Sequence, residues 1–230
     1  HAYEPIVNAA FEYMCKGTNF NRPAEIELEC AEKLLSMIKG AEMVKFAKNG
    51  SDAINGGVRL SRAYTDRDMV AICGSQPFFS VDDWFIGSTP MSAGIPKVIQ
   101  GLTLKFQYND IESVKALFRQ YPGRIACVIL EAEREQEPKN NFLHELKKIC
   151  HDNGTVFMID EMITGFRWHN GGAQGFHEII PDLSAFGKAM ANGFSVSALV
   201  GRREIMQLGG LKHNRLRVFL MSLTHGAETH

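Results

Sequence analysis

The sequence has no apolar run approaching the roughly 18 residues that a membrane-spanning helix needs, which argues against a bilayer span. It also has no excess of either charge. Lys and Arg number 25 against 26 Asp and Glu, for a formal net charge of −1 at pH 7. This balance gives no electrostatic reason to expect nucleic acid or an anionic membrane as a partner.

Paired spacings of metal-binding or disulfide-forming residues are missing as well. The eight histidines show no spacing such as His-Glu-x-x-His, so metal catalysis has no support. The cysteines are odd in number and unpaired in spacing, which disfavours a disulfide framework or a zinc knuckle. They fit a reducing compartment, and we expect a cytoplasmic protein. These residues are Cys15, Cys30, Cys73, Cys127 and Cys150.

What the chain does contain is the composition of one soluble globular domain, with 45% apolar and 22% charged residues among 230. Apolar runs alternate with helical patterns along it. Strands are expected at 43–47, 69–74, 125–130 and 156–160, and helices at about 28–38, 51–63, 111–118 and 142–150. This alternation predicts an α/β fold with a mostly parallel sheet covered on both faces. The aromatic, Ser-, Gly- and Pro-rich segment 76–94 is expected to form a long functional loop.

Two residues with reactive side chains stand at the ends of apolar runs that are candidate strands. Asp160 ends TVFMID, and Lys188 ends PDLSAFGK. Ligands of parallel sheets bind at the carboxyl ends of strands, so we expect both side chains at one site. Pyridoxal 5'-phosphate (PLP) chemistry needs this combination. A Lys amine can hold the PLP aldehyde as a Schiff base, while an Asp carboxylate keeps the ring nitrogen protonated, so that the ring accepts electrons from a carbanion.

The pair also has other interpretations. A nucleotide-binding P-loop around Gly187 and Lys188 fails, because Asp182 stands where its first glycine is required and Ala189 replaces the magnesium-binding Ser or Thr. Taken singly, Lys188 could be a surface lysine at a strand end, and Asp160 a helix cap or a salt-bridge partner.

A short polar turn provides a candidate phosphate site. Asn49, Gly50, Ser51 and Asp52 follow an expected strand and open a helix, so their backbone N–H groups and the Ser51 hydroxyl could bind a phosphate at the positive helix end. The alternative is an ordinary turn in which Ser51 or Asp52 caps the helix.

These motifs together resemble the class III aminotransferases, and within that family the glutamate-1-semialdehyde aminomutase branch. The matching stretches are 159–167, 181–188, 224–230 and 49–53 followed by Arg59-Leu60 and Arg62-Ala63. Their order and spacing agree along essentially the whole chain. The resemblance implies the large domain of a fold-type I PLP-dependent transferase. The chain lacks an initiator Met, and family members continue beyond its last motif into a smaller domain. We therefore expect residues 1–230 to be a large-domain core without either end of the protein.

The resemblance also implies roles for individual residues. Lys188 and Asp160 would be catalytic. The PLP-binding set would be Asn49, Gly50, Ser51, Phe78, Asp160, Met162, Lys188 and Thr224. Phe78 would stack on one face of the PLP ring and Met162 would pack on the other. Thr224 would reach the phosphate of the neighbouring subunit in a homodimer.

Several positions depart from the family pattern. Asn49 replaces a small hydroxyl residue, which removes a side-chain phosphate contact but not the backbone contacts. Phe78-Phe79-Ser80 replaces Tyr-His-Gly. Glu131 resembles a glutamate that ends a central strand, but Ala132 replaces the proline after it, and we expect Glu131 to lie outside the residues that contact the cofactor.

The predicted function is PLP-dependent transfer of an amino group from an amino donor to a carbonyl acceptor. Aminotransferase and aminomutase remain open, because the two carry out the same half-reactions on two molecules or on one. Two further alternatives are another PLP reaction, such as racemisation or decarboxylation, and a noncatalytic α/β binding module. The presence of both Asp160 and Lys188 argues against the noncatalytic module.

Overall fold

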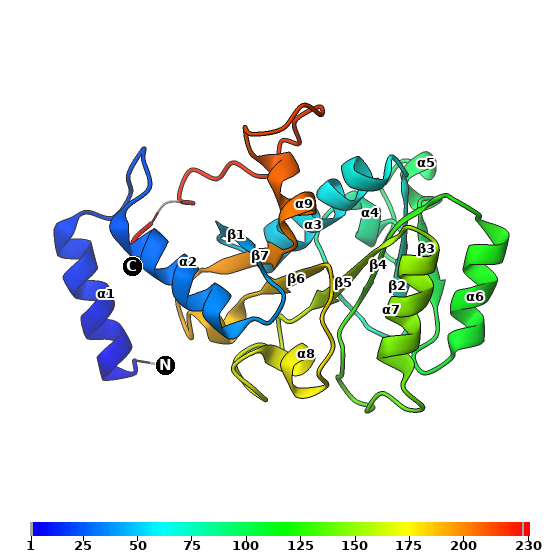
Figure 1. Ribbon diagram of the computed structural model, residues 1–230. Coiled ribbons are helices and arrows are strands. Elements are labelled where there is room, and N and C mark those ends of the chain that lie inside the picture. The colour runs from blue at the N-terminus through cyan, green and yellow to red at the C-terminus, as the bar shows by residue number, and fades with distance from the viewer. Residues whose placement is uncertain (1, 227) are drawn as a thin grey trace.

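The computed structural model describes residues 2–226 and 228–230. Its centre is a seven-stranded sheet (Figure 1) in the order β1-β7-β6-β5-β4-β2-β3. The strands are β1 (Met43–Ala47), β2 (Met69–Cys73), β3 (Thr103–Phe106), β4 (Ile125–Leu130), β5 (Val156–Asp160), β6 (Leu183–Phe186) and β7 (Ser197–Gly201). Strand β7 pairs antiparallel with both β1 and β6, and the other pairings are parallel. The expected mostly parallel α/β sheet is therefore confirmed.

Helices cover both faces of this sheet (Figure 1). The longer ones are α1 (Glu4–Lys16), α2 (Glu25–Met37), α3 (Gly50–Thr65), α6 (Ile111–Gln120) and α7 (Phe142–Asp152). Short helical turns are α4 (Asp83–Ile86), α5 (Lys97–Gln100), α8 (Gly172–Phe176), η1 (Lys188–Met190), α9 (Arg203–Met206) and η2 (Gln207–Gly209). The helices expected from periodicity are present with slightly different ends. The segment expected as a long loop, 76–94, contains the one-turn helix α4.

The core consists of two apolar layers, one on each side of the sheet, because successive side chains of a strand point to opposite faces. In β2, Val70 and Ile72 pack in the layer that contains α3, whereas Ala71 and Cys73 pack in the layer that contains α6 and α7. Strands β2, β4 and β5 are buried along their whole length. Such burial holds the carboxyl ends of β4 and β5 rigidly at one edge.

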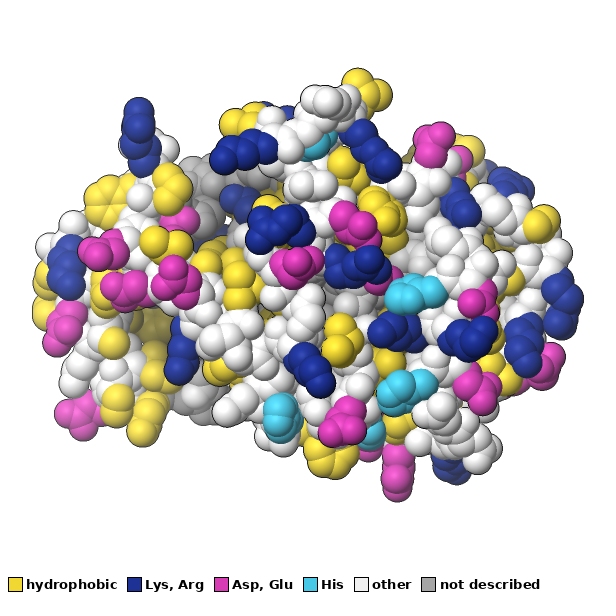
Figure 2. Space-filling model, in the orientation of Figure 1, with side chains coloured by type: hydrophobic (Ala, Val, Ile, Leu, Met, Phe, Trp, Pro, Cys, Tyr) yellow, Lys and Arg dark blue, Asp and Glu magenta, His cyan; other side chains and the backbone are white. Residues whose placement is uncertain are grey.

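Charges of both signs are interspersed over the visible surface, and apolar side chains gather around α1 (Figure 2). Helix α1 lies at one end of the molecule, away from the sheet (Figure 1), with Tyr3, Val7 and Phe11 exposed. None of the helices in the described part of the chain has the length and apolar character needed to cross a bilayer.

Candidate functional site

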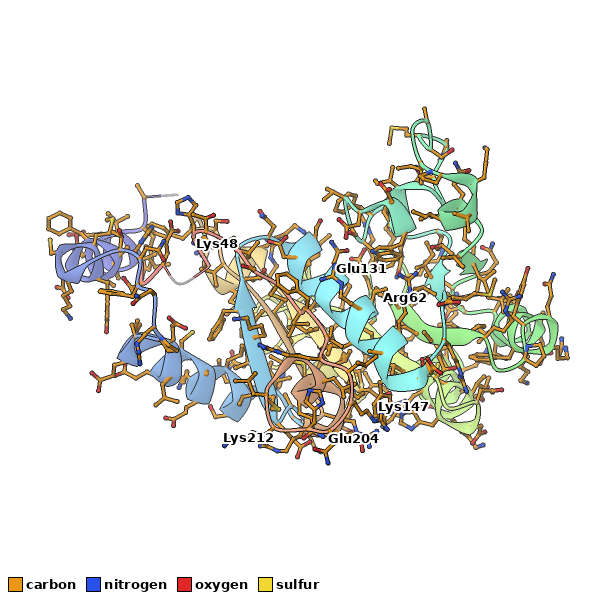
Figure 3. The ribbon with its side chains drawn as sticks, turned by 90° about the horizontal axis from the view of Figure 1, so that it is seen from above. Lys48, Arg62, Glu131, Lys147, Glu204 and Lys212 are labelled. Carbon is orange, nitrogen blue, oxygen red and sulfur yellow. The ribbon has the colours of Figure 1, made fainter. Side chains whose placement is uncertain are left out.

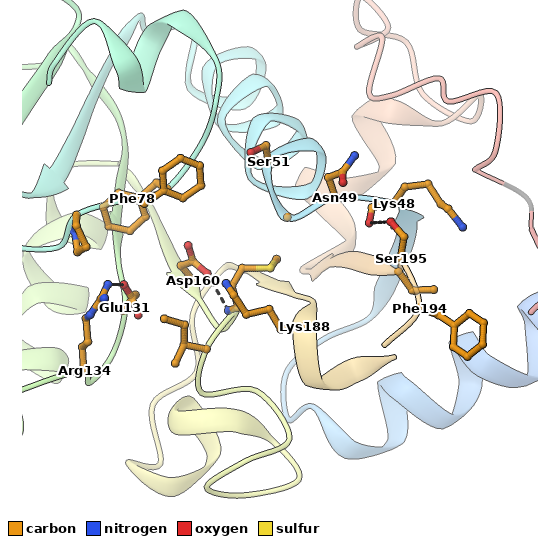
Figure 4. Close-up of a pocket in the computed structure, with 16 residues that line it drawn as sticks. Lys48, Asn49, Ser51, Phe78, Glu131, Arg134, Asp160, Lys188, Phe194 and Ser195 are labelled. Atoms are coloured by element: carbon orange, nitrogen blue, oxygen red, sulfur yellow. Dashed lines mark hydrogen bonds and ion pairs between the residues drawn. The ribbon is translucent and has the colours of Figure 1, made fainter. Parts of the chain in front are cut away.

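A cavity of about 390 Å³ opens at the carboxyl ends of the central strands, beside the N-terminus of α3 (Figure 4). Its lining residues are Lys48, Asn49, Gly50, Ser51, Pro77, Phe78, Phe79, Glu131, Arg134, Asp160, Met162, Ile163, Lys188, Phe194, Ser195 and Val196. The structure thus brings together every residue of the predicted site except Thr224. These residues come from separate segments of the chain, which meet only through the strand order.

Asp160, the last residue of β5, lies at the bottom of this cavity with only 3% of its surface exposed. Its Oδ1 accepts a hydrogen bond of 2.8 Å from the Met162 N–H. Burial raises the pKa of Asp160 from 3.8 to about 7, and the neighbouring carboxyl groups of Glu131 and Glu161 act in the same direction. The Met162 N–H and the Lys188 ammonium oppose that rise. Asp160 is therefore a buried carboxyl group whose charged form is short of a cationic partner.

Lys188 follows β6 and Gly187, and both it and Asp160 project into the cavity (Figure 4). Its φ of 44° lies in the left-handed region, which side-chain-bearing residues rarely adopt. The Lys188 carbonyl accepts a hydrogen bond of 3.0 Å from the Asn192 N–H, which helps to hold this turn. Backbone conformations of this kind persist where the surroundings enforce them, and they concentrate at functional sites.

Met162 forms part of the cavity wall between two glycines. A Cβ added to Gly50 would lie 2.7 Å from the Met162 sulfur, and one added to Gly187 would lie 2.6 Å from it. Both distances are too short for non-bonded atoms, so any side chain at either position would displace Met162. Glycine at both positions therefore lets the turn before α3 and the turn after β6 approach the same side chain.

The turn before α3 has the geometry of an anion site. Its helix cap differs from the one expected for an ordinary turn. Asn49, rather than Ser51 or Asp52, is the N-cap residue. Asp52 lies one turn inside and accepts a 3.0 Å hydrogen bond from the Asn49 N–H. The Ser51 Oγ accepts a hydrogen bond of 3.1 Å from the Val81 N–H, so its hydroxyl hydrogen can still be donated. The first-turn N–H groups of Gly50 and Ser51 have no acceptor within the helix and carry its positive end.

The aromatic side of the cavity comes from the segment after β2. Phe78 is half exposed and meets Phe85 edge to face, with ring centroids 5.7 Å apart. Phe79 packs on the same Phe85 ring and is almost fully buried. Phe78 therefore has a free ring surface, whereas Phe79 belongs to the core.

Glu131, which we expect outside the residues that contact the cofactor, nevertheless belongs to the cavity wall. It follows β4 and lines the cavity at 2% exposure, and its Oε1 lies 3.0 Å from Arg134 Nη1. Burial raises the pKa of Glu131, and the Arg134 guanidinium partly offsets the rise. One signal could have placed it, since Glu131 ends an apolar run just as Asp160 does. The other lining residues that sequence reasoning missed come from loops, where no such signal exists.

Thr224 is not among the residues that line the cavity of its own chain. Its carbonyl oxygen accepts a hydrogen bond of 2.8 Å from Asn19 Nδ2. The prediction for Thr224 concerned a neighbouring subunit, which a single chain does not test.

Comparison with known proteins places these features in a family. The family model described as aminotransferase class-III matches residues 1–214. A glutamate-1-semialdehyde 2,1-aminomutase of Thermosipho melanesiensis is 36% identical over 220 residues, which are 90% of this chain and 52% of that protein. The chain therefore spans about half the length of the curated relatives it matches.

Solved structures agree in fold. An omega-transaminase from Sphaerobacter thermophilus is 26% identical, with a TM-score of 0.85 over 99% of this chain and 57% of that one. A structure described as a transaminase with PLP bound is 24% identical and has a TM-score of 0.90, over 100% of this chain and 56% of the other. With a family match over most of its length and this fold, the chain belongs to the class-III aminotransferases.

Proposed function

We propose that the complete protein containing this chain uses PLP to transfer an amino group between an amino compound and a carbonyl compound. It acts either as an aminotransferase or as an aminomutase of the glutamate-1-semialdehyde type. The observation that carries the proposal is that Lys188, Asp160 and the N-terminus of α3 meet in one cavity. The family match supports the reaction class, and the curated relatives support the aminomutase. Residues 1–230 would form the PLP-binding large domain.

The residues of the cavity fit this cofactor. PLP carries an aldehyde, a ring nitrogen and a phosphate, and the cavity offers an amine, a buried carboxylate and a helix N-terminus. One oxygen of Asp160 is engaged by the Met162 N–H, which leaves the other for a ring N–H. The pKa of Asp160, about 7, means that its charged form gains from a cationic partner, and a protonated ring nitrogen is such a partner.

Each residue then has a defined task. When bound, PLP supplies an electron sink for a carbanion formed next to the amine. Lys188 would hold the aldehyde carbon and, once displaced by the substrate amine, its Nζ would take the proton from the substrate carbon that bears the nitrogen. Asp160 would keep the ring nitrogen protonated. Burial holds Asp160 in place, and the left-handed turn fixes the Lys188 backbone, so only the Lys188 side chain would have to move during the reaction.

The remaining cavity residues would bind and orient. The backbone N–H groups of Gly50 and Ser51, with the Ser51 hydroxyl, would hold the phosphate at the positive end of α3, next to Asn49. Phe78 offers a free ring surface for stacking, and Met162 would pack against the opposite face of the cofactor ring.

We also propose that the protein is a cytoplasmic homodimer in which Thr224 serves the neighbouring subunit's phosphate site. Exposed apolar side chains on α1, including Val7 and Phe11, support an interface on that part of the molecule. An exposed Thr224 outside the cavity of its own chain is compatible with this role. Cysteines that are all free support a reducing compartment.

Borohydride reduction of the complete protein tests the assignment. We expect a yellow protein in which reduction fixes a pyridoxyl group on Lys188, identified by peptide mass mapping. Lys45 and Lys212 serve as internal controls, because neither is among the residues that line the cavity. Figure 3 shows Lys212 well away from Lys48 and Glu131. A label on either control lysine, or no label, would contradict the proposal. A label on Lys188 without amino transfer would favour racemisation or decarboxylation instead.

A further inference from the structure

One ion pair in the cavity wall has no part in the roles above. Glu131 and Arg134 both line the cavity, with Glu131 Oε1 3.0 Å from Arg134 Nη1 (Figure 4). The Glu131 side chain is 3% exposed and that of Arg134 is 31% exposed. Arg134 also borders a smaller polar hollow formed with Gln76 and Tyr108. The pair therefore sits between the bottom of the cavity and more open space.

Glu131 has one oxygen that nothing satisfies. Its Oε2 is buried and has no hydrogen-bond partner among the described residues. A buried carboxylate oxygen without a donor is costly, and native structures rarely retain one without a reason. The torsion that turns a glutamate carboxylate is soft, so a modest rotation can present this oxygen to the cavity.

The main chain of Glu131 cannot retreat to relieve that cost, because one side chain holds it on both sides. Gln76 Nε2 donates to the Glu131 carbonyl oxygen at 2.8 Å, and the Glu131 N–H donates to Gln76 Oε1 at 2.8 Å. Gln76 is itself 7% exposed. The backbone that carries the carboxylate is therefore fixed in the wall of the cavity, and only the side-chain torsions can turn the carboxylate.

The charges around the cavity decide what kind of group suits this acceptor. Among the described residues, the cationic side chains that line it besides Lys188 are Lys48, paired with Glu228, and Arg134, paired with Glu131. A substrate carboxylate near Arg134 would meet a guanidinium that is already compensated, and it would be repelled by Glu131. A hydroxyl group both donates and accepts, so it can donate to Glu131 Oε2 and accept from a guanidinium N–H.

We infer that Glu131 and Arg134 together recognise a hydroxyl group of the amino substrate, which makes a hydroxylated amino compound, such as an amino alcohol or amino sugar, the preferred substrate class. This inference rests on the aminotransferase form of the proposed function, because glutamate-1-semialdehyde has no hydroxyl group, and it places the amine of the hydroxylated compound at Lys188. Glu131 and Arg134 are then specificity-determining residues, whereas Lys188 would move the proton and Asp160 would hold the ring nitrogen.

Equilibrium binding tests the inference without turnover. The complete protein carrying Lys188→Ala is loaded with PLP and titrated by calorimetry with ethanolamine, propanolamine and butanolamine. Alkylamines of matched length lack the hydroxyl, and glycine, β-alanine and γ-aminobutyrate replace it by a carboxylate. For at least one chain length we expect the amino alcohol to bind about tenfold more tightly than the alkylamine, as for a hydrogen bond to a charged group.

Variants on the same background identify the residues responsible. Glu131→Gln leaves Arg134 uncompensated, so the preference should turn from the alcohol to the carboxylate compound. Arg134→Met should abolish the preference for the alcohol without creating one for the carboxylate. Glu133→Gln is the matched control, because Glu133 contacts His177 at 2.6 Å and is not among the residues that line the cavity. It should bind like the parent.

The outcomes separate this inference from the proposed function. Retention of the PLP absorption band shows that each variant is folded and loaded. If the band and the Lys188 label are present but alcohols and alkylamines bind equally at every length, the inference is overturned and the proposed function stands. An alcohol preference that Glu131→Gln leaves unchanged would overturn it as well. Absence of both the band and the label in the wild-type protein would remove the proposed function, and the inference with it.

Discussion

Replacing Asp160 by Asn should have opposite effects on the protein without and with its cofactor. The substitution preserves shape, and the amide oxygen can still accept the 2.8 Å hydrogen bond from the Met162 N–H. What changes is the charge of a group that is 3% exposed. The fold should therefore persist, and any difference reports on the charge alone.

In the cofactor-free protein, the ionised Asp160 carboxylate lowers the free energy of unfolding. Its pKa of about 7, against 3.8 in an unfolded chain, makes ionisation of the folded form unfavourable by about 4 kcal/mol, at about 1.36 kcal/mol for each tenfold change in proton affinity. The folded state binds the extra proton between these two pKa values, so its stability falls as pH rises from about 4 to about 7 and stays low above that. Asp160→Asn should be more stable than the wild type at pH 8, and the difference should vanish near pH 4.

With PLP bound, the wild-type carboxylate should be favoured over the amide of Asp160→Asn. The carboxylate then has a cationic ring N–H as its partner, and removing one partner of a buried pair costs about 3–5 kcal/mol. An amide N–H instead favours the unprotonated ring nitrogen, so the cofactor stays bound but accepts electrons poorly. If that cost appears in the transition state, turnover should fall about 10²- to 10⁴-fold.

Urea unfolding of the complete cofactor-free protein at several pH values measures the first effect. Steady-state amino transfer at saturating PLP measures the second. Equal pH dependence of stability in the wild type and Asp160→Asn would refute the electrostatic reasoning. Near-normal turnover of the variant would remove Asp160 from its proposed role.

The remaining predictions concern backbone geometry and the proposed homodimer. Gly172→Ala should destabilise the protein by about 1–3 kcal/mol more than Gly123→Ala in urea unfolding, although φ is positive at both positions, 75° and 67°. A Cβ on Gly172 would lie 2.4 Å from the buried Glu161 carboxyl, whereas one on Gly123 would meet no described atom within 4 Å; equal costs would disprove the argument. Mixing Lys188→Ala and Thr224→Ala subunits of the complete protein should create one wild-type site in each heterodimer, because that site takes its lysine and its threonine from different subunits. Activity no higher than that of the two parents would leave Thr224 as an ordinary turn residue.

Much of this architecture is readable from local patterns. Strands 43–47, 125–130 and 156–160 have the bounds that their apolar runs predict. The alternation of strands and helices predicts the parallel sheet, because hydrophobic periodicity is a property of neighbouring residues. Asp160 and Lys188 stand out for the same reason, since each ends such a run. Strands β3 and β7 were not predicted, and the antiparallel direction of β7 follows from its pairing with β1 and β6.

Other features of the site exist only after distant segments have come together. Glu131 lines the cavity because β4 lies next to β5 in the sheet, an order that the chain does not spell out. The two hydrogen bonds between the Gln76 side chain and the Glu131 main chain join positions 55 residues apart. Met162 can pack between Gly50 and Gly187 because the ends of three segments meet there. Periodicity and motifs mark which side chains reach the edge of the sheet, but burial, ion pairing and the unpaired carboxylate oxygen depend on long-range packing. Those properties set the charge of the cavity.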